Sequence, residues 1–339
     1  MPDSQYARGP AMRDVANAAG VSAQTVSRVL NDHPNVQDST RQRVMSAVER
    51  LGYRRNYTAR ALVTGRSRTL GLLTLATNNY SRSSLALGIE RGAREAGYTV
   101  NSVTSTLSTE SLVDAVGRLV FQGVDGIILS APLLEAVDQI KKLTTRIPTI
   151  NTDGSATWGD ELVGVDQDIS AVLATQHLLD LGHETVWHVA GPSEWSDAAS
   201  RRDSWRRTLQ ENGCDVPPEL HGDWSPESGY HSGLVLGRNP EVTAIFVASD
   251  EMAFGVLRAL TELGRRVPED VSVVGIDDID LAAYSNPPLT TVRQSFEDTG
   301  RRAVQRLVAM IANPKMSSPP DLVAPTLMVR GSTAPPPGR

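Results

Sequence analysis

The chain has 339 residues, a hydrophobic content of 40%, a formal net charge of −6 and a single cysteine, Cys214. This length suits two or three domains with a sizeable core, and the absence of any apolar run of about 18 residues excludes a membrane-spanning helix. The first 20 residues contain Asp3, Arg8, Arg13 and Asp14 and lack an apolar stretch, so no signal peptide is evident. Because a lone cysteine forms no internal disulfide, we expect a cytoplasmic protein.

The charge is distributed unevenly along the chain. Residues 1–68 hold eleven arginines against five acidic residues, a net charge of +6, which leaves −12 for the remainder. A basic N-terminal segment attached to an acidic body indicates that the N-terminal segment binds phosphate groups, as nucleic-acid-binding modules do.

Residues 12–31 predict two short helices joined by a tight turn. Apolar residues recur at helical spacing in both halves, and Gly20 can end the first helix because glycine accepts a positive φ. Ser22 can cap the second helix. Such a pair is a helix-turn-helix, although two solvated helices of an ordinary core would give the same pattern. Outside its apolar stripe, the second helix carries side chains that can form hydrogen bonds, and none of them is acidic. They are Gln24, Thr25, Ser27, Arg28 and Asn31.

Two further helices are expected before the body of the chain. Asp38 or Ser39 can cap a third helix that runs to about Leu51 and closes at Gly52. The segment 56–65 has the length of about two helical turns, which is marginal in water without a partner surface. We therefore interpret it as a hinge helix that links the basic segment to the body.

From Thr69 onward, apolar runs of strand length alternate with amphipathic helical stretches. Buried, non-alternating strands of this kind are typical of parallel sheets built from right-handed βαβ units. This alternation of strands and helices occurs twice along the chain, so we predict two similar lobes, 69–165 and 166–290. The segments 290–295 and 320–332 are expected to cross back between them. The predicted strands are 70–76, 98–104, 125–130, 148–153, 185–191, 243–249 and 272–277.

Polar side chains follow many of these strands, where the carboxyl ends of a parallel sheet form a ligand-binding crevice. Each taken alone is commonly a helix cap. Together, carboxylates, amides, an arginine and an indole suit a polyhydroxylated ligand. The set comprises Asn78, Asn79, Asp153, Arg201, Trp224, Ser249, Asp250, Asp277 and Asp278.

Catalytic motifs are missing from the sequence. There is no phosphate-binding Walker loop, no G-x-G-x-x-G after the first strand and no G-x-S-x-G elbow. His183, Glu184 and His188 resemble a zinc-protease box, but the histidines are five residues apart and His188 lies in a strand-like run. We therefore expect no enzyme, no metal and no cofactor.

The sequence resembles the lactose-repressor/galactose-repressor family of bacterial transcription regulators over essentially its whole length. The resemblance rests on DVANAAGVSAQTVSRVLN, TRQRVMSAVERLGY and ARALVTG near the N-terminus, and on GHETVWHVAGP, AIFVASDEMAFGVLRAL, VSVVGIDDIDLAAYSNPPLTTV and VRGST in the body. It implies an all-α helix-turn-helix domain at 1–55, a hinge helix at 56–68, and an α/β body at 69–339. The body would consist of two doubly wound parallel-sheet lobes, like periplasmic binding proteins.

The resemblance also implies which residues contact DNA. Arg28 would pair with a guanine and Gln24 with an adenine in the major groove, and Leu62 would wedge into the minor groove. Ala23 stands where the lactose repressor has a large aromatic residue, so a different operator is expected. The DNA-binding set is Ser22, Ala23, Gln24, Thr25, Ser27, Arg28, Asn31, Asn35, Thr40, Asn56, Ala59 and Leu62.

For the effector, the resemblance implies a small molecule, a mono- or disaccharide, held between the lobes. The matching positions are Asn78, Asp153, Arg201, Trp224, Ser249, Asp250, Asp277 and Gln294.

The predicted function is therefore that of a repressor that binds palindromic double-stranded operator DNA and is released by a sugar. A homodimer is expected rather than a tetramer, because the C-terminus lacks leucine heptads. Three alternatives stay open. They are a regulator of the same family that a ligand or protein activates for DNA binding, a sugar receptor without DNA activity, and an α/β enzyme.

Overall fold

The structure, a computed structural model, describes residues 10–30, 33–53, 65–76, 79–131, 137–153, 161–316 and 318–338. The contacts within it divide the chain into two units, Met1–Ser67 and Arg68–Arg339. Most of the predicted hinge helix lies outside the described residues, as do five predicted site residues: Asn31, Asn56, Ala59, Leu62 and Asn78. The domain boundaries predicted at 55/56 and 68/69 therefore stay predictions.

The first unit contains three helices around a small apolar core. They are α1 (Met12–Ala19), α2 (Ala23–Leu30) and α3 (Asp38–Leu51). Gly20 ends α1 at a φ of 64°, and Ser22 Oγ accepts the Thr25 N–H at 3.1 Å to cap α2. These contacts confirm the predicted helix-turn-helix. The core residues are Val15, Ala16, Ala19, Val26, Val29, Val44, Ala47 and Tyr53.

One detail of this unit differs from the prediction. The third helix begins at Asp38 itself, and its N-cap is Gln37, whose side chain makes no capping hydrogen bond. The cap predicted at Asp38 or Ser39 is therefore wrong. Asp38 instead lies in the first turn, where its negative charge favours the positive end of the helix dipole.

The first lobe of the second unit is built on a four-stranded parallel sheet of order β2-β1-β3-β4. All five residues of β3 are buried, as expected for a strand covered on both faces. The strands are β1 (Thr69–Leu75), β2 (Thr99–Ser105), β3 (Gly126–Ser130) and β4 (Thr149–Asn151), and the helices between them are α5 (Tyr80–Glu95), α6 (Thr109–Phe121) and α7 (Val137–Leu143).

The second lobe is built on a six-stranded sheet of order β12-β10-β9-β8-β6-β7, parallel except for β12. Its strands are β6 (Trp187–Ala190), β7 (Leu220–His221), β8 (Ala244–Val247), β9 (Ser272–Asp277), β10 (Thr290–Arg293) and β12 (Thr326–Met328). Its helices are α8 (Gln167–Asp180), α9 (Ser196–Glu211), α10 (Pro226–Gly237), α11 (Asp250–Glu262) and the 3-10 helix η2 (Asp280–Ala283).

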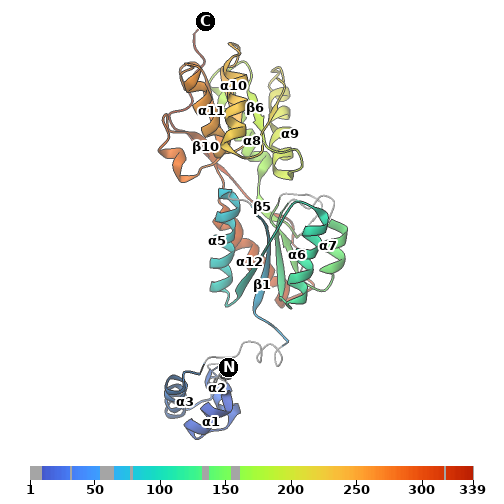
Figure 1. Cartoon of the computed structure of the whole chain (residues 1–339), viewed down its shortest axis with the longest axis vertical. Helices are drawn as coiled ribbons and strands as arrows, with labels where there is room; N and C mark the ends of the chain where they lie inside the picture. The colour runs from blue at the N-terminus through green and yellow to red at the C-terminus, as the bar shows by residue number, and fades with distance from the viewer. Residues whose placement is uncertain are drawn as a thin grey trace, which may run out of the picture. The chain divides into compact units, whose positions relative to one another are not determined.

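The chain passes between the lobes three times. It leaves the first lobe after β5 (Val163–Val165), returns after β10 with α12 (Phe296–Ala312), and leaves again after β11 (Asp321–Val323), which pairs with β5. Figure 1 shows α12 beside α5 in the lobe that contains β1. The sequence predicted neither β5 nor β7, because strands of three and two residues carry almost no periodic signal.

These lobes confirm the predicted fold class, a helical helix-turn-helix unit with an α/β body of parallel sheets. Every helix among the described residues is too short or too polar to cross a membrane.

Helices α5 and α12 approach each other at backbone distance. A Cβ placed on Gly88 of α5 would lie 2.3 Å from the Glu297 carbonyl oxygen of α12, closer than real Cβ atoms come to backbone. This contact lies close to the region between the lobes, because α5 and α12 both begin there, at Tyr80 and Phe296.

We predict that Gly88→Ala destabilises the body by about 1–3 kcal/mol, because the added methyl group forces the two helices apart. The control is Gly117→Ala in α6, where an added Cβ meets nothing within 4 Å. That change should be neutral or stabilising by up to about 1 kcal/mol, through helix propensity. Urea unfolding of both variants measures the difference, and equal stabilities would contradict the backbone contact.

Candidate functional site

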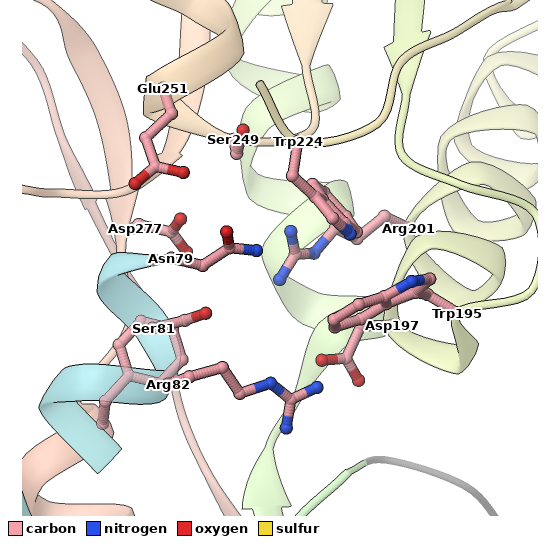
Figure 2. Close-up of a pocket in the computed structure, with 11 residues that line it drawn as sticks. Asn79, Ser81, Arg82, Trp195, Asp197, Arg201, Trp224, Ser249, Glu251 and Asp277 are labelled. Carbon is pink, nitrogen blue, oxygen red and sulfur yellow. The ribbon is translucent and has the colours of Figure 1, made fainter. Parts of the chain in front are cut away.

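A pocket lies between the two lobes, where helices begin and strands end. It encloses about 400 Å³ of space free of protein atoms, a figure that includes space open to solvent. Figure 2 shows charged and aromatic side chains from both lobes pointing toward this space. The pocket is lined by Asn79, Ser81, Arg82, Trp195, Asp197, Arg201, Trp224, Ser249, Glu251, Asp277 and Phe296.

Arg201 is the cation that the second lobe contributes. It lies on α9, is 5% exposed, and packs its guanidinium 5.6 Å from the centre of the Trp224 ring. Its Nε donates to Gln167 Oε1 at 2.8 Å and one terminal nitrogen donates to the Ala248 carbonyl at 2.5 Å. These neutral acceptors fix the position of the guanidinium at the pocket.

Arg82 is the cation that the first lobe contributes, from the first turn of α5. It donates to Ser130 Oγ at 2.8 Å and forms a buried ion pair with Asp153 at 3.1 Å. Its guanidinium also lies 5.0 Å from the centre of the Trp195 ring, which belongs to the second lobe. Arg82 therefore connects the two lobes through a cation–π contact.

The two tryptophans form an aromatic wall. Their ring centres are 5.7 Å apart and the planes meet at 75°, an edge-to-face pair. Trp224 is held at a φ of 74°, a conformation that side chains other than glycine rarely adopt. Its Nε1 is buried and has no hydrogen-bond partner among the described residues, so it is available to a ligand acceptor.

Three carboxyl groups in the pocket have raised pKa values. Burial raises the pKa of Asp277 well above its ordinary value, against the opposing influence of Arg201. Burial first and the charge of Asp153 second raise the pKa of Asp197 to about 7. Burial also raises the pKa of Glu251, although its carboxylate accepts the Tyr80 N–H at 3.3 Å. The pocket can thus offer both acceptors and protonated carboxyl donors to a ligand's hydroxyl groups.

Four of the predicted effector residues line this pocket: Arg201, Trp224, Ser249 and Asp277. Asn78 lies outside the described residues, but its neighbour Asn79 lines the pocket, as the capping residue of α5 whose side chain makes no capping bond.

The other three predicted residues are not among those that line this pocket. Asp153 pairs with Arg82. Gln294 exchanges hydrogen bonds with Gln167, which in turn holds Arg201. Asp250 accepts the Thr291 hydroxyl at 2.5 Å and the Ile279 N–H at 3.0 Å, so its carboxylate joins α11 to β10 and to the segment after β9.

Six lining residues were not predicted: Ser81, Arg82, Trp195, Asp197, Glu251 and Phe296. All lie at or just beyond the start of a helix that follows a strand. A search of the first helical turn after each strand would have found them, because those turns share the crevice with the strand ends.

The candidate nucleic-acid interface is the outer face of α2. Ala23, Gln24 and Arg28 are exposed, and so is Asn35 beyond the helix. Ser22 and Thr25 are engaged in the cap, while Ser27 and Thr40 are half-buried. Arg41 of α3 donates to the Val29 and His33 carbonyls, at 3.5 and 3.2 Å, and so ties α3 to the end of α2 and the residues after it.

Among the described residues there is no group of three His, Cys, Asp or Glu side chains that could hold a metal ion.

Comparison with known proteins gives matches to both parts of the chain. A family described as "Bacterial regulatory proteins, lacI family" matches residues 11–56, and "Periplasmic binding protein-like domain" matches residues 175–333. The chain is 32% identical to the ribose operon repressor of Escherichia coli (strain K12) over 328 residues, which are 95% of this chain and 99% of that protein.

Two solved structures extend these matches. The lac repressor dimer bound to operator and the anti-inducer ONPF superimposes with a TM-score of 0.90 at 32% identity, covering 96% of this chain and all of that one. The complex of the transcriptional regulator CelR with cellobiose gives a TM-score of 0.72 at 31% identity, covering 95% of this chain and 99% of that one.

We predict that Thr291→Val destabilises the protein by about 1–3 kcal/mol, because it leaves the buried Asp250 oxygen without its donor. Thr145→Val, an exposed threonine that donates only to carbonyls of its own helix segment, should change stability by less than about 0.5 kcal/mol. Urea unfolding compares the two. Equal effects would show that Asp250 does not need this hydrogen bond.

Proposed function

This chain belongs to the lacI family of bacterial regulatory proteins, and we propose that it is a homodimeric repressor that leaves its operator when a sugar fills the pocket between its lobes. The observation that carries the proposal is the pocket itself, to which the first lobe contributes Arg82 and the second lobe contributes Arg201, the carboxyl groups and the paired tryptophans. A ligand that touches both lobes can change how they are arranged.

On the DNA side, the exposed Arg28 and Gln24 of α2 would read base edges in the major groove. Asn56, Ala59 and Leu62 would act in the hinge, with Leu62 in the minor groove. Two copies related by a two-fold axis read two half-sites, so the operator would be palindromic. The lac repressor dimer bound to operator supports this arrangement.

On the effector side, a mono- or disaccharide fits the pocket chemistry. Hydroxyl groups pair with the carboxyl and guanidinium groups, and the apolar face of a sugar ring suits an indole. The ribose repressor's name and the CelR–cellobiose complex support a sugar as the class of effector.

The mechanism is a shift between two states of the dimer. The sugar must bind the state of low DNA affinity more tightly than the other, since equal affinity would leave the equilibrium unchanged. The protein would work in the cytoplasm, where its operator lies, and would bind the sugar without converting it.

We predict that Arg28→Ala weakens binding to an operator selected from random DNA by about 1–3 kcal/mol and relaxes the base preference at one position in each half-site. Arg238→Ala, an exposed arginine of the body, should keep wild-type affinity. A gel-shift titration compares the variants. Equal losses would mean that the two arginines act only through charge.

We further predict that a sugar from a thermal-shift screen both stabilises the protein and dissociates the operator complex. At 100 times its dissociation constant, such a ligand adds about 2.7 kcal/mol to the free energy of unfolding. The Arg28→Ala variant should show the same thermal shift, because its body is unchanged. A sugar that strengthens operator binding would show that the ligand acts as a co-repressor and does not release the DNA. Chemical conversion of the sugar by the purified protein would support the α/β enzyme alternative.

A further inference from the structure

His33 lies just beyond α2, the helix that would read the operator, in the segment that leads to α3. Its side chain is exposed, as are those of Pro34 and Asn35. Its backbone N–H donates to the Arg28 carbonyl at 3.0 Å, so His33 is attached to the last turn of α2, which also carries Arg28. The exposed imidazole therefore has a defined place at the end of the candidate nucleic-acid interface.

The backbone of His33 is also tied to α3. Its carbonyl accepts a hydrogen bond from a terminal nitrogen of Arg41 at 3.2 Å, and the other terminal nitrogen of Arg41 donates to the Val29 carbonyl of α2 at 3.5 Å. The ring of the next residue, Pro34, restricts its own φ to about −65°. A residue that is held from two helices in this way loses little conformational entropy when it binds a ligand.

The imidazole ring is held in one tautomer by its own turn. Its Nδ1 accepts the Asn35 N–H at 3.3 Å, which is the pattern that Asn and Asp side chains form in Asx turns. A ring nitrogen that accepts a hydrogen bond carries no proton, so the proton of the neutral ring is on Nε2. Among the described residues, Nε2 has no hydrogen-bond partner. His33 thus presents one free N–H donor beside α2.

A DNA phosphate is the acceptor that suits this donor. A helix in the major groove lies between two phosphate backbones, and most hydrogen bonds from proteins to DNA go to phosphate and sugar oxygens. Residues 1–68 carry a net charge of +6, which attracts an anionic backbone. His33 follows α2 and does not belong to the helix itself, which favours a backbone contact over a contact with a base edge.

We propose that His33 Nε2–H donates a hydrogen bond to a backbone phosphate of the operator, and that the Asn35 N–H holds the ring in the donating tautomer. This contact rests on the proposed function and adds a residue to its DNA-binding site, because the set predicted from the sequence omits His33. The ring acts as a neutral donor. It therefore strengthens binding whatever the base sequence and contributes no positive charge.

Two amide side chains separate the donor of His33 from its role in the turn. In His33→Asn the side-chain oxygen lies near the place of Nδ1, so the turn with Asn35 is kept and the Nε2 donor is lost. In His33→Gln the amide nitrogen reaches the place of Nε2, so the donor is kept and the turn is lost. His33→Ala loses both. The control is His231→Asn, at an exposed histidine of α10 in the body.

The test is a gel-shift titration of the full-length protein with an operator selected from random DNA, at about pH 8, where an ordinary imidazole is neutral. We expect His33→Ala and His33→Asn to bind about tenfold or more weakly, because each copy in the dimer loses a hydrogen bond to a charged acceptor. His33→Gln should stay within a few-fold of wild type, and His231→Asn should equal it. The opposite order, with His33→Asn equal to wild type and His33→Gln weakened, would overturn the phosphate contact and leave only the turn.

Two further readouts separate a neutral phosphate contact from its alternatives. Operators selected by His33→Asn should show the wild-type base preference at every position, unlike those selected by Arg28→Ala, and a changed preference would indicate a base contact instead. The salt dependence of its affinity between about 50 and 200 mM should match wild type, because a neutral donor releases no counterion. A shallower dependence would contradict the neutral ring.

The same titrations distinguish failure of the contact from failure of the proposed function. If the wild-type protein selects no DNA, the proposed function fails and the contact fails with it. If the wild type binds an operator and none of the His33 variants alters the affinity, the contact alone is overturned.

Discussion

Two guanidinium groups buried between two lobes impose the main constraint on this structure. A buried charge is costly unless it is paired and hydrogen-bonded, so Arg82 and Arg201 each require acceptors in fixed places. Asp153 and Ser130 serve Arg82. Gln167 and the Ala248 carbonyl serve Arg201. The hydrogen bonds and the ion pair that these two guanidinium groups require hold the starts of α5, α8 and α9 around a common space. That space is the pocket.

The same constraint suggests how a ligand could act as a switch. Several contacts across the pocket are polar and each crosses from one lobe to the other, including Glu251 with the Tyr80 N–H and Ser196 with Asp153. Polar contacts of this kind exchange readily for hydrogen bonds to hydroxyl groups, unlike the apolar cores within each lobe. Helices α5 and α12 touch at backbone distance, so the start of α5 is packed directly against α12.

The fold could be predicted almost completely, while the site could be predicted only in part. The helix-turn-helix followed from Gly20, Ser22 and the apolar stripe, which are local signals. Arg201, Trp224, Ser249 and Asp277 followed from their places after strands and from the family resemblance, and all four line the pocket. Asp250 has the same sequence signature, yet its carboxylate turns toward Thr291 and Ile279. Position after a strand predicts proximity to the crevice but does not give the direction of a side chain.

By itself, the sequence determined the order of the elements, the basic charge of the N-terminal unit and the class of fold, because periodicity, capping and composition act over a few residues. Only the tertiary structure decided that Arg82 belongs to the pocket, that α12 returns to the first lobe, and that Ser196 meets Asp153. These pairs are separated by tens of residues or more. Their meeting depends on where three chain crossings place the lobes, which no local pattern encodes.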